Sequence, residues 1–219
     1  GRGDGGPPDR DHARRRQDRY TRLVNIFMKI GVLALQGDFA EHQVMLESLG
    51  VQVNQVRLPV DLDGLRGLII PGGESTTIGK LSDAFGLTTA LREFASSHAV
   101  WGTCAGTIFL SKDSGKKQTL LGVMDITTTR NAFGRQVDSF EVDLRVPVLV
   151  NSAGENTLYH AVFIRAPLIQ KVGPGVEVLA TLDDGRIVAA QQGKLLATSF
   201  HPELTRDNRF HKYFLELAK

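Results

Sequence analysis

The sequence contains a single cysteine, Cys104, in the stretch 102–106, GTCAG, where a predicted strand gives way to a predicted helix. The spacing Gly-x-Cys-x-Gly has the form of a nucleophile elbow, a sharp strand-to-helix turn that exposes one side chain and tolerates only small neighbours. Helix dipoles place partial positive charge at the start of a helix, which favours a thiolate over a thiol. The pattern therefore predicts a cysteine nucleophile. The alternative is a buried structural cysteine, the usual fate of a lone Cys with apolar neighbours.

A cysteine nucleophile needs a base within hydrogen-bond reach and a group that orients the base. The stretch 199–203, SFHPE, follows the last predicted strand and supplies His201 and Glu203, separated by a proline that stiffens the turn. We expect His201 to act as the base and Glu203 to orient it, although Glu203 could instead be a solvated carboxylate at a helix start. The remaining histidines are expected at the surface or at the edge of the core: His12, His42, His98, His160 and His211.

A glycine turn follows the third predicted strand, in the stretch 71–76, PGGEST. If the third and fourth strands are neighbours, the N–H groups of Gly73 and Ala105 can together form an oxyanion hole, worth on the order of 3 kcal/mol per donor. The alternative, which the spacing supports equally, is a turn followed by a helix that Ser75 or Thr76 caps. The Gly-x4-Gly-Lys-Ser/Thr pattern of a phosphate-binding loop is missing from this stretch.

Short apolar runs alternate with helical periodicity through the first half of the chain. The first helix is expected between an Asp38 cap, with Glu41 at capping-box spacing, and a stop at Gly50. Its apolar face is predicted to carry Phe39, Gln43, Leu46 and Leu49. Strands are expected at 30–35, 51–56, 67–70 and 99–101, and further helices at 76–85, 87–97 and 107–112. This order predicts a doubly wound sheet with right-handed crossovers.

The second half reads mostly as strands joined by turns. Strands are expected at 120–129, 140–150, 161–164, 176–181, 186–191 and 195–200, followed by a helix over 207–219. Because several connections are too short for crossovers, part of the sheet must be antiparallel. The prediction is one α/β domain over residues 28–219, with a mixed, mainly parallel sheet flanked by helices, as in flavodoxin-like folds.

Residues 1–27 differ from the rest in composition. They carry a formal charge of +3 and almost no apolar side chains, so we expect a disordered extension, a tag or a mis-assigned start.

The rest of the chain is near neutral and shows no basic stripe with interleaved aromatics, which argues against nucleic-acid binding. No apolar run is long enough to span a membrane. One cysteine excludes an internal disulfide or a multi-thiolate zinc site and favours the reducing cytoplasm.

Taken together, these stretches resemble the class I glutamine amidotransferases with a Cys-His-Glu triad, and among them the glutaminase subunits of pyridoxal 5′-phosphate synthase. The resemblance covers the chain from about Met28 to its end. The motifs that carry it are LQGD at 35–38, EH at 41–42, PGGESTT at 71–77, GTCAG at 102–106, RN at 130–131, FGRQVDSF at 133–140, FIRAP at 163–167 and FHPEL at 200–204.

The resemblance implies that Cys104 attacks the carboxamide of L-glutamine, releases ammonia and forms a γ-glutamyl thioester that water cleaves to glutamate. His201 would transfer the protons and Glu203 would hold its imidazole in the productive tautomer. The resemblance also implies a set of residues that bind glutamine: Gly73, Glu74, Ser75, Arg130, Ile164 and Arg165. A simpler alternative makes the two arginines surface ion-pair partners.

The same resemblance implies a partner, the synthase subunit of pyridoxal 5′-phosphate synthase, which receives the ammonia in a hetero-oligomeric complex. Gln36 lies in the stretch that resembles the family's contact with that subunit, so docking is expected to organise the oxyanion site. No cofactor or metal is implied.

Two alternative functions remain. One is a cysteine hydrolase related to intracellular peptidases and glyoxalases, which commonly place His directly after the nucleophile, where this chain has Ala105. The other is a non-catalytic scaffold that binds a synthase.

Overall fold

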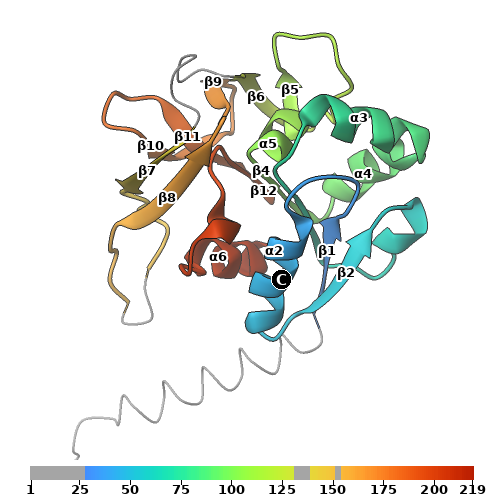
Figure 1. The fold of residues 1–219 in the computed structure, drawn as a ribbon, viewed down its shortest axis with the longest axis horizontal. Coiled ribbons are helices and arrows are strands. Elements are labelled where there is room, and N and C mark those ends of the chain that lie inside the picture. The colour runs from blue at the N-terminus through green and yellow to red at the C-terminus, as the bar shows by residue number, and fades with distance from the viewer. Residues whose placement is uncertain (1–27, 131–138, 151–153) are drawn as a thin grey trace, which may run out of the picture.

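The chain forms one large mixed sheet with helices on both faces (Figure 1). The computed structural model describes residues 28–130, 139–150 and 154–219. The predicted extension, residues 1–27, lies outside the described residues. So do Asn131 of the RN motif and residues 133–138 of the FGRQVDSF motif. Along the sheet the strands follow the order β2-β1-β3-β4-β12-β11-β9-β6-β5, and β10 pairs with β11.

Five parallel neighbours make up the first part of this sheet, and their bounds follow the predicted apolar runs. They are β2 (Gln52–Val56), β1 (Lys29–Leu33), β3 (Gly67–Ile70), β4 (Ala99–Thr103) and β12 (Leu195–Thr198). Their side chains alternate between two separate hydrophobic clusters, as the period of a strand requires. In β4, for example, Trp101 belongs to one cluster and Val100 to the other. A strand covered on both faces needs the uninterrupted apolar composition seen in the sequence.

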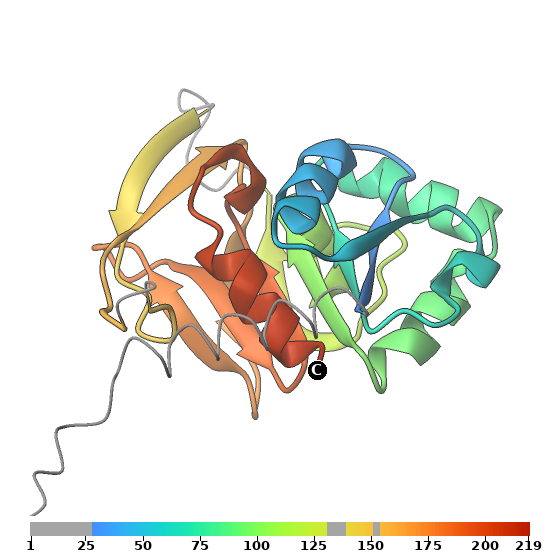
Figure 2. The ribbon, with the colours of Figure 1, turned by 90° about the horizontal axis from the view of Figure 1, so that it is seen from below.

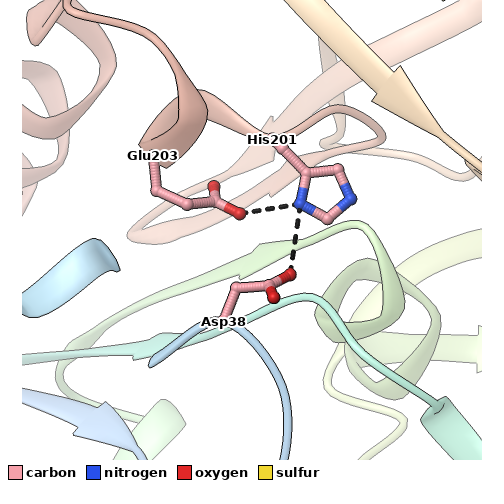
Figure 3. A group of neighbouring side chains, drawn as sticks. All are labelled: Asp38, His201 and Glu203. Carbon is pink, nitrogen blue, oxygen red and sulfur yellow. Dashed lines mark hydrogen bonds and ion pairs between the residues drawn. The ribbon is translucent and has the colours of Figure 1, made fainter. Parts of the chain in front are cut away.

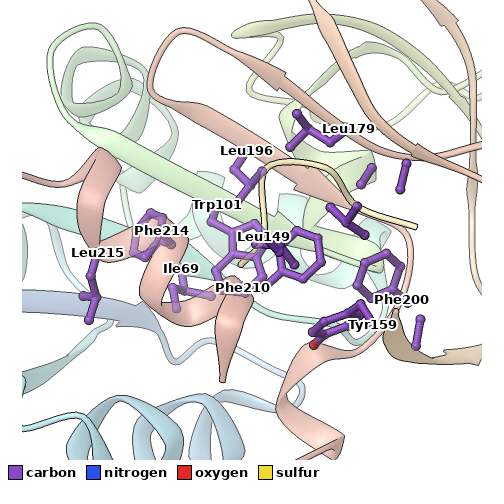
Figure 4. Close-up of a cluster of buried hydrophobic side chains, with 14 of the residues drawn as sticks. Ile69, Trp101, Leu149, Tyr159, Leu179, Leu196, Phe200, Phe210, Phe214 and Leu215 are labelled. Carbon is purple, nitrogen blue, oxygen red and sulfur yellow. The ribbon is translucent and has the colours of Figure 1, made fainter. Parts of the chain in front are cut away.

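One face of the sheet is covered by α2 (Phe39–Ser48) and α6 (Arg209–Leu217). Trp101 from β4 packs against Phe210 and Phe214 of α6, with ring centroids 6.1 and 5.7 Å apart (Figure 4). The opposite face is covered by α3 (Ser75–Ala84), α4 (Leu87–Ala95) and α5 (Ala105–Leu110). Burial of each large side chain in these layers contributes about 1.5–3 kcal/mol, so the two layers together hold the parallel strands in place.

The rest of the large sheet is mostly antiparallel. It contains β11 (Ile187–Gln192), β9 (Leu168–Val172), β6 (Met124–Thr129), β5 (Ser111–Asp113) and β10 (Glu177–Thr181). A separate antiparallel pair, β7 (Ser139–Leu144) with β8 (Tyr159–Ile164), stands at the end of the molecule opposite α3 and α4 (Figures 1 and 2). Two short 3₁₀ helices, η1 (Pro59–Leu62) and η2 (Pro202–Leu204), complete the described elements.

The predicted α/β fold with a mixed sheet is confirmed, and several local predictions were wrong. The strand expected at 120–129 begins only at Met124. The helix expected at 107–112 ends at Leu110, and Ser111 begins strand β5. Strand β9 was not predicted, because its sequence, LIQKV, does not alternate strictly between apolar and polar residues. The strand expected at 140–150 ends at Leu144. Asp38 stands at the N-cap of α2 but makes no side-chain capping hydrogen bond.

Within the described part of the chain, no helix is long and apolar enough to cross a bilayer.

Candidate active site

Four adjacent parallel strands direct the predicted site residues to one edge of the sheet. The neighbours β1, β3, β4 and β12 end just before Gln36, Gly73, Cys104 and His201, respectively. Because the carboxyl ends of parallel strands lie on the same edge, four segments that are distant in the sequence meet there. This explains how motifs that lie between Gln36 and His201 can form one site.

The turn at Cys104 has the strain expected of a nucleophile elbow. Its backbone φ is 47°, a left-handed value that a residue with a side chain rarely adopts. The flanking glycines are required by close backbone packing. A Cβ on Gly102 would lie 2.5 Å from the Gly106 carbonyl oxygen, and a Cβ on Gly106 would lie 2.0 Å from the Ile70 carbonyl oxygen. The sequence Gly-x-Cys-x-Gly is therefore explained by steric contacts on both sides of the cysteine.

His201 lies between two carboxylates at the end of β12 (Figure 3). Its Nδ1 is 2.7 Å from Glu203 Oε1, a hydrogen bond in which the ring N–H donates to the carboxylate. The Asp38 Oδ2 atom lies 3.5 Å from the same nitrogen. Both His201 and Glu203 are buried, whereas Asp38 is partly exposed. The opposite ring nitrogen, Nε2, is buried and makes no hydrogen bond with the described residues.

The electrostatics of this group favour a charged imidazole beside charged partners. Burial opposes the imidazolium, but the interactions with Cys104 and Glu203 outweigh burial and raise the pKa of His201. Burial also opposes the carboxylate of Glu203, yet its interactions with His42 and His201 lower its pKa. Burial raises the pKa of Asp38 despite the nearby His201. Glu203 is therefore the permanently ionised partner of the ring, and a positive imidazole is stabilised near the thiol.

A cavity of about 330 Å³ opens beside the thiol. The Cys104 Sγ atom is close enough to the Ile164 carbonyl oxygen, at 3.8 Å, to donate a weak hydrogen bond to it. This contact brings Ile164 to the site through its backbone. Arg165, the next residue, also has a left-handed φ of 44° and lines the cavity. The residues around the cavity are Gly73, Glu74, Ser75, Cys104, Ala105, Ile108, Arg130, Arg165 and Pro167.

The glycine loop after β3 is held by Gln36. The Gln36 Oε1 atom accepts a hydrogen bond of 2.8 Å from the Glu74 N–H. Gly73 has a φ of 140°, and a Cβ there would lie 2.4 Å from Gln36 Oε1, so only glycine fits. Ala105 is the first residue of α5, where backbone N–H groups have no acceptor within the helix. Gly73 and Ala105 thus line the same cavity as the thiol.

The glycine loop after β3 also starts a helix, but the residue that caps the helix differs from the predicted one. Glu74 caps α3, and its carboxylate accepts the N–H groups of Thr76 and Thr77. Burial opposes this carboxylate, but these hydrogen bonds prevail and lower its pKa to about 2. The predicted caps, Ser75 and Thr76, lie inside α3 instead.

Arg130 lines the same cavity and forms a partly exposed ion pair with Glu74. Its Nη2 atom lies 3.0 Å from Glu74 Oε1 and donates to the hydroxyls of Ser75 and Thr76 and to the Gln118 side chain. Gln118 was not anticipated from the sequence. This arrangement places a cationic group in the lining of the cavity and surrounds its Nη2 atom with acceptors.

Two histidines that were expected at the surface or core edge are fully buried, which corrects the prediction. His42 and His211 are each 0% exposed. His42 Nε2 lies 3.2 Å from Glu203 Oε2. The buried position on the inner face of α2 is His42, whereas the expected Gln43 is only partly buried. The available signal was the spacing, because His42 lies between Phe39 and Leu46 at helical intervals.

The carboxylates and the imidazole could in principle hold a metal ion, since ligand atoms of Asp38, His201 and Glu203 lie within 4.8 Å of one another. Two ligands of a tetrahedral zinc, each about 2.0–2.1 Å from the ion, would lie about 3.3 Å apart. The 2.7 Å between His201 Nδ1 and Glu203 Oε1 is a hydrogen-bond length. The pair therefore fits a shared proton better than a shared ion.

Comparison with solved structures shows the same fold in other proteins. A crystal structure titled as that of a glutamine amidotransferase is 52% identical, with a TM-score of 0.80, and the match covers 86% of this chain and 98% of that one. The structure of PurLQS from Thermotoga maritima superposes with a TM-score of 0.67 over 88% of this chain and 99% of that one, at 16% identity. The second likeness concerns the fold alone.

Sequence relatives are close along their full length. The pyridoxal 5′-phosphate synthase subunit PdxT of Herpetosiphon aurantiacus is 61% identical over 195 residues, which are 87% of this chain and 100% of the relative. The protein of the same name from Moorella thermoacetica is 56% identical over 192 residues, which are 87% of this chain and 99% of the relative. The profile of the SNO glutamine amidotransferase family matches residues 32–219. The chain belongs to the SNO glutamine amidotransferase family.

Proposed function

We propose that residues 28–219 form one amidotransferase domain whose active site is the cavity beside Cys104. The chain is the glutaminase subunit of pyridoxal 5′-phosphate synthase. It hydrolyses L-glutamine to L-glutamate and ammonia and supplies the ammonia to the synthase subunit. The single observation that carries the site assignment is the convergence of a strained thiol, an imidazole and a buried carboxylate on adjacent strand ends.

In the proposed mechanism the Cys104 thiolate attacks the side-chain carbonyl carbon of glutamine, and the carbonyl π electrons move to oxygen. The Gly73 and Ala105 N–H groups stabilise that oxyanion. His201 Nε2, which makes no hydrogen bond within the described residues, delivers its proton to the leaving nitrogen. The carbon–nitrogen bond breaks, ammonia leaves and a γ-glutamyl thioester remains on sulfur.

Hydrolysis of the thioester uses the same groups in reverse. The neutral His201 removes a proton from water, hydroxide attacks the thioester carbon, and the carbon–sulfur bond breaks to release glutamate and regenerate the thiolate–imidazolium pair. Glu203 stays ionised throughout, because its low pKa keeps the proton on His201 Nδ1. Its role is to fix the ring tautomer so that Nε2 faces the reaction.

For the substrate, we assign glutamine binding to Gly73, Glu74, Ser75, Arg130, Ile164 and Arg165. An α-carboxylate needs a cationic or N–H-rich receptor, and the arginines at the cavity supply the cationic groups. Glu74 is ionised and half-exposed, which suits an α-ammonium group. Ile164 contributes its backbone, since its carbonyl oxygen lies next to the thiol.

Partner docking is assigned to the loop that contains Gln36, and the reaction to the cytoplasm, where a lone thiol stays reduced. Gln36 contacts the glycine loop directly, so a partner that moves Gln36 changes the position of the Gly73 and Glu74 amides. Free ammonia is mostly protonated at neutral pH, and direct transfer to the synthase subunit preserves its nucleophilic form.

The test is reconstitution. The chain is mixed with a synthase subunit, L-glutamine, a pentose phosphate and a triose phosphate, and glutamate and pyridoxal phosphate are measured together. We expect both products, with little glutamate from the chain alone. A complex that forms but releases no glutamate would contradict the assignment and would support a non-catalytic scaffold.

A further inference from the structure

A pair of buried histidines lies directly behind the carboxylate of Glu203. His42 comes from α2 and His211 from α6, and both are 0% exposed. His42 Nε2 lies 3.2 Å from Glu203 Oε2, and His42 Nδ1 lies 3.0 Å from His211 Nε2. The contacts therefore run in a line from α6 through α2 to the carboxylate that holds His201. None of the steps in the mechanism above uses this line.

The packing around the pair fixes both rings. Trp101 makes edge-on contacts with His42 and His211, at centroid distances of 5.7 and 5.0 Å. His42 Nε2 makes a hydrogen bond of 3.2 Å with Thr103 Oγ1, and Glu203 Oε2 is its ion-pair contact at the same distance. Because the rings cannot rotate freely, the direction of the His42 nitrogens is set by the core of the protein.

The proton positions follow from burial and from the available partners. Burial lowers the pKa of His211 well below its usual value, with a further contribution from His42, so His211 is neutral. Its Nδ1 is buried and has no hydrogen-bond partner among the described residues. At His211 Nδ1, an unpaired acceptor nitrogen costs less free energy than an unpaired N–H donor. The proton of His211 therefore sits on Nε2 and is donated to His42 Nδ1. The proton of His42 then sits on Nε2, facing Glu203.

The oxygen that His42 faces has a particular need for this contact. Glu203 Oε1 accepts the hydrogen bond from His201. Glu203 Oε2 is buried, and within the described part of the chain no well-aligned hydrogen bond reaches it, which leaves the His42 contact as its polar interaction. A buried carboxylate oxygen without such a contact is costly, and the carboxylate would rotate to relieve it.

We propose that His42 is a positioning residue for the glutaminase reaction: its Nε2–H, set by His211, holds Glu203 so that Oε1 stays aligned with His201 Nδ1. This inference rests on the proposed function. Other charged groups face the same atoms. Asp38 lies 3.5 Å from His201 Nδ1, and Cys104 acts on the imidazole from the cavity side. Without the His42 contact, the Glu203 carboxylate would move away from His201 Nδ1. Asp38 would then compete with Glu203 for the Nδ1–H, and the imidazole of His201 would shift.

The test exploits two amides that mimic different nitrogens of the imidazole. In His42→Gln, the amide nitrogen can occupy the place of Nε2 and still face Glu203. In His42→Asn, the amide lies at the place of Nδ1, so the contact with His211 is retained and the contact with Glu203 is lost. A core-filling role alone would make the two variants alike, whereas the proposal makes the glutamine variant the better enzyme.

In the reconstituted complex we expect His42→Asn to lower kcat about tenfold, the scale of losing one contact with a charged group. The KM for glutamine should change little. The alkaline limb of the kcat/KM profile should move to lower pH, because a poorly aligned Glu203 stabilises the imidazolium less. His42→Gln should stay within about threefold of the wild-type kcat. Equal kcat values and equal pH profiles for the two variants would overturn the proposal.

A second readout separates this inference from the glutaminase assignment. Because Cys104 is the single cysteine of the chain, its alkylation by iodoacetamide reports the thiolate–imidazolium pair without any turnover. His42→Asn should alkylate more slowly than His42→Gln near neutral pH. This result is expected even if the complex releases no glutamate, so failure of the function and failure of the inference are distinguishable. Identical alkylation rates in wild type and both variants would refute the role of His42.

One further variant excludes a simple loss of stability. Leu46→Ala, also fully buried on α2, should lower the unfolding temperature and leave the pH profile of alkylation unchanged. A shifted profile in Leu46→Ala would show that destabilisation alone explains the effect and would overturn the proposal.

If neither His42 variant folds, the same comparison is made at His211, where Gln retains a donor toward His42 and Asn is too short. Equal alkylation rates for His211→Gln and His211→Asn would likewise overturn the proposal.

Discussion

Replacement of Gly73 by alanine tests the oxyanion site most sharply. The backbone φ of Gly73 is 140°, and an added Cβ would lie 2.4 Å from Gln36 Oε1 and 3.0 Å from Gln36 Cδ. Such a backbone conformation is essentially restricted to glycine and costs a residue with a side chain about 1–3 kcal/mol. The loop must therefore rotate, or Gln36 must leave its place, and either change moves the Gly73 N–H.

The size of the effect follows from these contacts. Displacement of Gln36 removes its hydrogen bond to the Glu74 N–H, worth about 1 kcal/mol. Loss of one oxyanion donor lowers kcat about 10²–10³-fold. The KM for glutamine should change less, because the oxyanion contact forms mainly in the transition state. The strain should lower the unfolding temperature by about 2–12 °C.

The assay is glutamate release by Gly73→Ala in the complex, beside thermal unfolding. The matched control is Gly64→Ala, because Gly64 also has a positive φ, 73°, but a Cβ there meets nothing within 4 Å. The control should lose about 1–2 kcal/mol of stability and keep its kcat. If kcat for Gly73→Ala stays within about twofold of wild type, the glycine loop does not supply an oxyanion donor.

Three other substitutions follow from the same geometry. Glu203→Gln should lower kcat less than Cys104→Ala and move the alkaline limb of kcat/KM to lower pH, since the carboxylate helps raise the pKa of His201; an unmoved limb in a pH–rate profile would contradict this. Gly106→Ala, whose Cβ would lie 2.0 Å from the Ile70 carbonyl oxygen, should cost about 3 kcal/mol or more and lower the unfolding temperature by roughly 6–12 °C; calorimetry showing no change would refute the elbow packing. Gln36→Ala should lower kcat in the complex about threefold to tenfold through loss of the Glu74 contact, with unchanged kcat as the contrary result in glutamate assays.

Much of the site was predictable because its chemistry demands unusual local sequence. A strained turn at Cys104 requires Gly102 and Gly106, and these small residues are visible in the sequence before any fold is known. The apolar runs of the parallel strands are equally visible, since burial on both faces removes polar residues. The order of the strands then brings the site together, because β1, β3, β4 and β12 are neighbours.

The parts that escaped prediction depend on tertiary contacts. His42 looks like an ordinary polar residue of a surface helix until α6 supplies His211 and η2 supplies Glu203. Strand β5 continues directly from α5, so no turn signal separates them. Asp38 matched a capping pattern, but its carboxylate lies near His201 instead of capping α2. In each case a distant segment outweighed the local propensity.

The central claim is that Cys104 is the nucleophile that hydrolyses glutamine. The most direct measurement is glutamate release by Cys104→Ala in the assembled complex, with assembly and unfolding temperature checked against wild type. Because alanine removes the sulfur with little change in volume or backbone preference, the variant should assemble normally and release no glutamate above the uncatalysed rate. Glutamate release near the wild-type rate by the assembled variant would contradict the account.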